Sequence, residues 1–270
     1  MFTATIFIAI LVAACIAGGW FWTLFLGILI FVGADEYIKL LNAKDINPSR
    51  VLIFLFSLIF LLLAHFNLPQ YFIHVIIFAF ILTFIWFLFT GKLPSSSDIF
   101  STVFGILYAG LMPVGFSLIR HIDKGAAHIG ILEPGAGFLL LTLLCICAVD
   151  IGAYYIGRKF GKNLLSPKIS PKKTVEGSIG GAISGILLAV IIGTFINISI
   201  VHSIILGIII VAIAQLGDLC ESLLKRDVGV KDSGDCVPGH GGVLDRADSY
   251  IMTASASYYY INYVIVSGLF

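Results

Sequence analysis

Charged residues are scarce in this sequence. Only 11% of its 270 residues are Asp, Glu, Lys or Arg, whereas soluble domains carry about 25%. The hydrophobic fraction is 59% and the mean hydropathy is +1.07, which excludes a soluble enzyme and also the low hydrophobicity that disorder requires. The composition therefore predicts an integral membrane protein. The formal net charge of +1 gives no indication of a nucleic-acid partner, and we expect none.

Several catalytic motifs are also missing. The five cysteines form no C-x-x-C pair, so neither a disulfide framework nor a zinc site is indicated. There is no G-x-S-x-G or H-E-x-x-H motif, and hydrolysis by a nucleophilic Ser or by zinc is unsupported. The stretch from Gly157 to Asn163 has one residue too few between its glycines for a phosphate-binding P-loop, and Asn163 stands where Ser or Thr should be.

Long apolar runs dominate what is present. A helix needs about 20 apolar residues to cross a bilayer, and nine such runs are separated by Gly, Pro, Asn or charged residues. They cover residues 2–17, 20–41, 50–65, 71–90, 99–119, 134–160, 175–197, 200–225 and 245–268. We therefore expect an all-α polytopic integral membrane protein with about nine transmembrane helices.

The basic residues predict the orientation of these spans. If the loop after the eighth span is cytoplasmic, alternation places fourteen of the sixteen Lys and Arg on that side, leaving only Arg120 and Lys124 outside. Such a bias is what the positive-inside rule predicts. We expect the N-terminus and the loops at 158–176 and 225–248 to be cytoplasmic, in a bacterial inner (plasma) membrane.

Four acids lie within or at the ends of the later spans. Asp150 and Asp218 each sit about 10 to 12 Å inside the end of a predicted helix. Asp245 and Asp248 are three residues apart and open the last span on one face. Carboxylates are costly in a membrane unless they have a cation or a partner, and clustered oxygens bind hard cations. The spacing therefore indicates a metal or substrate site, although structural ion pairs with Lys225, Arg226 and Arg246 would also explain these acids.

Two segments are suited to binding phosphate. Ser170–Gly177 combines Lys172, Lys173 and a hydroxyl with a helix N-terminus, which attracts anions. In the segment 239–242, three glycines around His240 allow the backbone to approach a phosphate closely. The alternatives are an ordinary basic loop and a plain turn between helices.

The run 222–232 followed by 238–248 closely resembles the signature of the phosphatidate cytidylyltransferases, also called CDP-diacylglycerol synthases. Matching positions are Ser222, Lys225, Arg226, Lys231, Asp232, His240, Gly241, Gly242, Asp245, Arg246 and Asp248. Asp150, Ala153, Tyr154, Gly157 and the segment 170–177 also look like that family. The resemblance covers about the last 120 residues. It divides the chain into 1–130, with about five generic spans, and 131–270, with the catalytic spans and cytoplasmic loops.

This resemblance implies an enzyme that converts CTP and phosphatidic acid to CDP-diacylglycerol and pyrophosphate in phospholipid biosynthesis. It further implies a requirement for magnesium and a homodimer within membrane lipids. An additional monovalent cation and the number of divalent ions stay open.

Residue roles follow as a hypothesis from this chemistry, in which two polyanions must meet. Asp218, Asp245 and Asp248 would hold one or two cations, with Asp150 as an additional ligand. Catalytic phosphate neutralisation and orientation would fall to Lys225, Arg226, Lys231, His240 and Arg246. The expected substrate-binding positions are Lys172, Lys173, Thr174, Ser222, Asp232, Gly241 and Gly242.

Two other functions are compatible with parts of the pattern. A CTP-dependent polyprenol or phytol kinase would use similar substrates but release CDP in place of pyrophosphate. A secondary transporter would also carry buried carboxylates and Gly-interrupted helices, but no inverted repeat is evident and the polar groups crowd onto one side.

Overall fold

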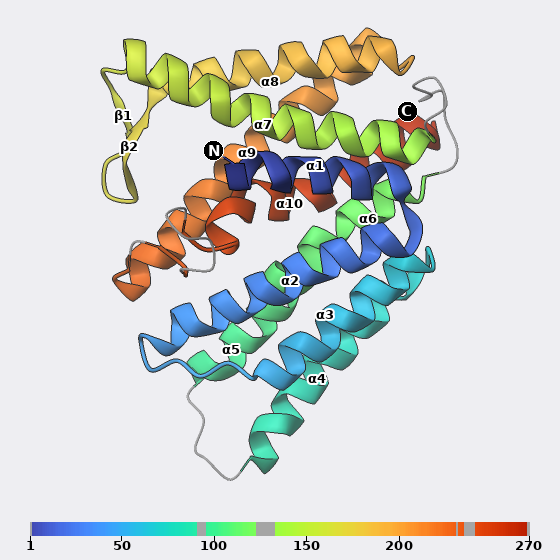
Figure 1. Cartoon of the computed structure of the whole chain (residues 1–270). Coiled ribbons are helices and arrows are strands. Elements are labelled where there is room, and N and C mark those ends of the chain that lie inside the picture. Colours follow the sequence, from blue (N-terminus) through green and yellow to red (C-terminus); the bar gives the residue numbers. More distant parts are fainter. Residues whose placement is uncertain (1, 91–95, 123–132, 231, 235–240, 269–270) are drawn as a thin grey trace.

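The computed structural model of the chain describes residues 2–90, 96–122, 133–230, 232–234 and 241–268, with side chains from residue 9 onward. Within these residues the chain is mostly helical, and successive helices run in alternating directions through one bundle (Figure 1). Because each backbone N–H and C=O inside a helix is satisfied within that helix, this architecture suits a hydrocarbon environment.

The first half of the chain forms two long helices followed by three more helical segments. These are α1 (Phe2–Ala17), α2 (Gly19–Asn42), α3 (Arg50–His65), α4 (Phe72–Phe89) after a 3₁₀ turn at Pro69–Tyr71, and a continuous stretch of α5 (Ser96–Gly105), a π-helical turn (Ile106–Leu111), a 3₁₀ turn (Met112–Val114) and α6 (Gly115–Arg120). The irregular turns surround Pro113, whose ring and missing N–H are incompatible with a regular α-helix.

The second half contains four helices and a β-hairpin. These elements are α7 (Pro134–Phe160), β1 (Leu164–Ser166), β2 (Ser170–Thr174), α8 (Val175–Phe195), α9 (Ile200–Val228) and α10 (Leu244–Tyr260), which continues as a π-helical turn at Ile261–Val266. The antiparallel pair β1–β2 projects from the bundle where α7 ends and α8 begins (Figure 1). This segment was expected to be a loop, so the hairpin is an addition to the predicted fold.

Local sequence signals account for several helix ends. Pro134 occupies the first turn of α7, where its missing N–H costs nothing. Thr174 and Ser199 cap α8 and α9 by accepting hydrogen bonds from Gly177 N, at 3.1 Å, and His202 N, at 3.3 Å. Gly229 ends α9 in the left-handed conformation, with φ of 82°.

Glycines allow the helices of the second half to approach closely. A Cβ atom at Gly181 would lie 2.7 Å from the carbonyl oxygen of Val149, across the α7–α8 contact. At Gly217 in α9, a Cβ atom would lie 2.6 Å from the carbonyl oxygen of Asp248 in α10. Small residues at such crossings are typical of membrane helices, and the second crossing lies at the level of a predicted site acid.

Five helical segments are long and apolar enough to cross a membrane, within the part of the chain that the structure describes. They are Pro69–Phe89, Ser96–Arg120, Pro134–Phe160, Val175–Phe195 and Ile200–Val228, while α3 is apolar but shorter. The fold is thus that of an all-α membrane protein. Each of the nine predicted spans coincides closely with a helical segment, but the number that cross the bilayer stays a prediction.

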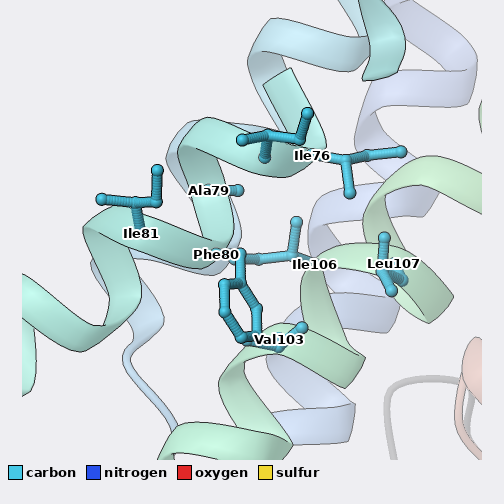
Figure 2. A pocket seen from close by; sticks show the side chains of 8 residues that line it. Ile76, Ala79, Phe80, Ile81, Val103, Ile106 and Leu107 are labelled. Carbon is cyan, nitrogen blue, oxygen red and sulfur yellow. The ribbon is translucent and has the colours of Figure 1, made fainter. Parts of the chain in front are cut away.

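Helix α4 is the most loosely attached of the five, with only Ala79 and Thr83 buried. It borders an apolar recess of about 300 Å³ opposite α5 and the π-helical turn (Figure 2). The lining is wholly hydrophobic and includes Phe80, Val103 and Leu107. This recess therefore offers no polar group for chemistry on a nucleotide.

Candidate active site

Charged side chains from β2, α9 and α10 meet where these elements approach one another. Lys173 of β2 forms an ion pair with Asp218 of α9, and both side chains are partly buried. Seven residues further along α9, Lys225 forms a second ion pair, with Asp245 of α10. We call Lys173, Asp218, Glu221, Lys225 and Asp245 the ionic cluster; it joins segments separated by up to 72 residues, from 173 to 245.

Lys225 lies between two carboxylates. Its Nζ atom is 2.7 Å from Asp245 Oδ1 and 2.5 Å from Glu221 Oε2. The contact with Glu221 follows from their i, i+4 spacing on α9. The Glu221 side chain is fully buried, and neither of its oxygens has a partner with hydrogen-bond geometry among the described residues. Electrostatic attraction to Lys225 is therefore its main compensation for burial.

Asp245 is held by the backbone as well as by Lys225. Its Oδ2 atom accepts hydrogen bonds from Ser233 N and Gly242 N, both at 2.9 Å. Gly241 has a positive φ of 82°, and a Cβ atom there would lie 2.9 Å from the same oxygen. A glycine at this position thus lets the chain turn tightly around the carboxylate. The predicted glycine segment therefore orients an acid directly.

Asp150 and Asp248 lie near the ionic cluster. Both carboxylates lie close enough to Lys173 to interact with it electrostatically. The side chain of Asp150 is exposed on the surface of α7, whereas that of Asp248 is only partly exposed. Of the four predicted metal ligands, Asp218 thus lies on α9, Asp245 and Asp248 lie on α10, and Asp150 lies on α7.

The two adjacent lysines of the predicted anion site occupy different environments. Lys172 is exposed, whereas Lys173 turns toward α9 and is partly buried. Burial lowers the pKa of Lys173, since it disfavours the ammonium form, and the carboxylates of Asp248 and Asp150 oppose this shift. Lys173 is the member of the pair that belongs to the ionic cluster.

The remaining predicted site residues are not part of the ionic cluster. Arg226 donates hydrogen bonds to the carbonyl oxygens of Ile169 and Val230, both at 3.2 Å, and so ties the hairpin to the end of α9. Thr174 caps α8. Ser222 is buried on α9, and Asp232 and Arg246 are exposed. Lys231 and His240 lie outside the described residues.

Glu36 of α2 was not singled out in the sequence, yet it reaches the start of α10. Its two carboxylate oxygens accept hydrogen bonds from Val243 N, at 3.0 Å, and from Leu244 N, at 2.7 Å. The residue is only 4% exposed. An acid within an apolar span was the available signal, because such residues are costly unless they are functional or paired.

The donor set fits a divalent cation in chemistry. Magnesium prefers carboxylate oxygens, and the predicted ligands Asp150, Asp218, Asp245 and Asp248 are all carboxylates. Within the described ranges, no three His, Cys, Asp or Glu side chains converge closely enough to hold an ion. The ammonium groups of Lys173 and Lys225 contact two of these acids, Asp218 and Asp245. These two carboxylates are therefore neutralised by lysine side chains.

Fold and site together define a membrane protein with a cluster of paired charges at one end of a helical bundle. The sequence model of the cytidylyltransferase family matches residues 1–264. The chain belongs to this family.

Relatives in bacteria and plants agree with that membership. The chain is 36% identical to a phosphatidate cytidylyltransferase of Synechocystis sp., covering 96% of this chain and 94% of the relative. It is 34% identical to the chloroplastic phosphatidate cytidylyltransferase 5 of Arabidopsis thaliana, over 91% and 67% of the two chains. A Pseudomonas aeruginosa phosphatidate cytidylyltransferase is 33% identical, over 86% and 84%. The predicted resemblance is confirmed.

Proposed function

We propose that this protein transfers a cytidylyl group from CTP to phosphatidic acid and so forms CDP-diacylglycerol and pyrophosphate. The observation that carries the proposal is the ionic cluster, which includes the signature positions Lys225 and Asp245 in a chain of the cytidylyltransferase family. The relatives are named for this reaction. Because the cluster lies at an end of the bundle, a nucleotide from water and a lipid headgroup from the bilayer surface can both reach it.

The reaction needs little base catalysis. A phosphomonoester has a second pKa of about 6, so an oxygen of the lipid phosphate is already anionic at neutral pH. It attacks the α-phosphorus of CTP, the bond from that phosphorus to the bridging oxygen breaks, and pyrophosphate leaves with the electron pair. The main obstacle is repulsion between the two anions, which positioning and charge neutralisation overcome.

The lysines of the ionic cluster supply positive charge. Lys173 forms an ion pair with Asp218, and Lys225 forms one with Asp245. A phosphate entering the site offers each ammonium group a doubly charged alternative partner. Lys172, exposed beside Lys173, and the exposed Arg246 add charge for the triphosphate or the lipid headgroup. We expect Lys231 and His240 to contribute in the same way.

We further propose that one or two magnesium ions bind at Asp218, Asp245 and Asp248, with Asp150 as an additional ligand. Bound there, magnesium would neutralise phosphate charge and help to orient the two reactants. A monovalent cation beside magnesium stays an open part of this proposal.

The finer topology belongs to the same proposal. Nine spans would place the ionic cluster on the cytoplasmic side, with fourteen of the sixteen Lys and Arg. The exposed ion pair between Lys44 and Asp227 joins the α2–α3 link to the end of α9, which supports a common side for these two ends. The proposed setting is the bacterial inner membrane, with the protein as a homodimer.

The by-products of the reaction test the proposal. Purified protein would be incubated with CTP labelled at the α- and γ-phosphates, phosphatidic acid and magnesium. Release of pyrophosphate together with CDP-diacylglycerol, identified by mass spectrometry, is the expected result. Release of CDP with a phosphorylated lipid would indicate a kinase, and solute flux in proteoliposomes without a lipid product would indicate a transporter. Either outcome would overturn the assignment.

A further inference from the structure

Glu36 belongs to α2, in the half of the chain that the signature does not cover. Its side chain nevertheless contacts the start of α10. Its side chain is buried, and its carboxylate accepts one hydrogen bond at each oxygen, from Val243 N and Leu244 N. Val243 is the N-cap residue of α10 and Leu244 is the first residue of the helix, so neither N–H group has an acceptor within the helix. The negative charge also interacts favourably with the helix dipole.

Two bonds from one rigid carboxylate constrain the helix more than a single cap would. They determine both where α10 begins and how it is rotated about its axis. Asp245 is the residue immediately after Leu244, and Asp248 lies one turn further. The direction in which both proposed metal ligands point is therefore coupled to the position of Glu36.

Two glycines that precede α10, Gly234 and Gly242, closely approach the same carboxylate. A Cβ atom at Gly234 would lie 2.9 Å from Glu36 Oε1, and one at Gly242 would lie 2.5 Å from Oε2. Gly242 also donates its N–H to Asp245 Oδ2. Gly242 thus lies between the buried acid of α2 and a site acid of α10.

We propose that Glu36 is a positioning residue for cytidylyl transfer, holding α10 so that Asp245 and Asp248 face the substrates. The proposal rests on the proposed function above. It assigns a specific task to a helix that otherwise resembles a generic span. A purely structural cap would stabilise the protein without affecting the site in particular.

The test compares Glu36→Gln with Asp35→Asn. Each variant removes one negative charge from α2, at neighbouring positions. Asp35, however, pairs with Lys39 and Arg50, on α2 and at the start of α3. The Gln side chain keeps one acceptor oxygen and turns an amide donor toward the second N–H. Loss of a partner that orients metal ligands typically costs about tenfold to a hundredfold in metal affinity or activity. We expect a loss of that size in the apparent magnesium constant or kcat for Glu36→Gln, and wild-type kinetics for Asp35→Asn.

A second readout does not depend on turnover. Hydrogen exchange of the Val243 and Leu244 amides should accelerate in Glu36→Gln, and thermal stabilisation by added magnesium should shrink. Gly234→Ala keeps every ionisable group and presses a methyl group against Glu36, so it should shift the same readouts in the same direction if Glu36→Gln fails to fold.

The outcomes separate the two proposals. If Glu36→Gln and Gly234→Ala keep the wild-type magnesium dependence and kcat, or if their activity falls only as far as their folded fraction, the positioning role is wrong. If wild-type protein makes no CDP-diacylglycerol, the proposed reaction fails, while amide exchange and magnesium-dependent stabilisation still decide the role of Glu36.

Discussion

Lys225 Nζ and Asp245 Oδ1 lie 2.7 Å apart, joining α9 to α10 across 20 residues of sequence. The same ammonium group is 2.5 Å from Glu221. With both acids ionised, these three side chains carry one net negative charge. Loss of the Lys225 ammonium group would therefore leave two acids facing each other without a cation between them.

Replacing Lys225 with Met should both destabilise and inactivate the protein. Glu221 is fully buried and Asp245 is 11% exposed, so the change leaves two acids without their cation. Breaking a buried pair costs about 3 to 5 kcal/mol of unfolding free energy. Thermal unfolding in detergent and the rate of CDP-diacylglycerol formation would both be measured.

Lys44→Met serves as the matched control, because Lys44 pairs with Asp227 at the surface, where the two side chains are 45% and 61% exposed. Such a pair contributes about 0 to 1 kcal/mol. Equal destabilisation by the two substitutions would contradict the assignment of Lys225 to a buried ionic cluster.

Asp245→Asn should abolish magnesium-dependent turnover while the protein stays folded. The amide oxygen can still accept a hydrogen bond from Ser233 N or Gly242 N, so the segment before α10 keeps part of its support. The lost charge removes a magnesium ligand and the partner of Lys225. Activity titrated against magnesium is the measurement, with circular dichroism as the folding control. Wild-type activity would remove Asp245 from the proposed ligands.

The adjacent lysines should respond differently to substitution. Lys173→Met removes the ammonium group that contacts Asp218, and we expect a large fall in kcat/KM, by about two orders of magnitude or more for loss of a charged group acting on the transition state. Lys172→Met removes an exposed charge and should mainly raise the apparent substrate constant. Steady-state kinetics with each substrate varied would separate the two, and identical effects would argue against the distinction.

Thr174→Ala should lower stability more than it alters substrate binding. The hydroxyl caps α8, and loss of such a cap costs about 1 kcal/mol. Thr174→Ser retains the cap and should restore the unfolding temperature. If the alanine variant instead raised KM for CTP without a change in stability, Thr174 would bind substrate as the sequence suggests.

The fold was largely predictable from the sequence because hydropathy alone marks apolar helices and Gly, Pro and charge mark their ends. The hairpin at Leu164–Thr174 was not, since its few residues lack strand periodicity and their pairing depends on the ends of α7 and α8. The irregular turns around Pro113 were also beyond prediction, because proline signals a disturbance without specifying its geometry.

The sequence predicts which residues make up the candidate site, but only some of the contacts between them. The i, i+4 spacing of Glu221 and Lys225 predicts that they share a face, and they are in contact. Which lysine pairs with which acid could not be deduced, since Lys173 and Asp218 come together only through tertiary packing. The contact of Glu36 with the start of α10 could not be predicted, because no local pattern links α2 to a segment more than 200 residues later.

Gly217 carries no chemical group that could act on a substrate, yet it is where α9 crosses α10 beside Asp248. The smallest side chain would put a carbon atom 2.6 Å from a backbone oxygen of the facing helix, so any replacement must wedge the two helices apart and displace the acids on both. A random-mutagenesis screen for inactive protein should therefore recover substitutions of Gly217 as well as of the charged residues. Such a result would show that Gly217 is required because no side chain fits between α9 and α10.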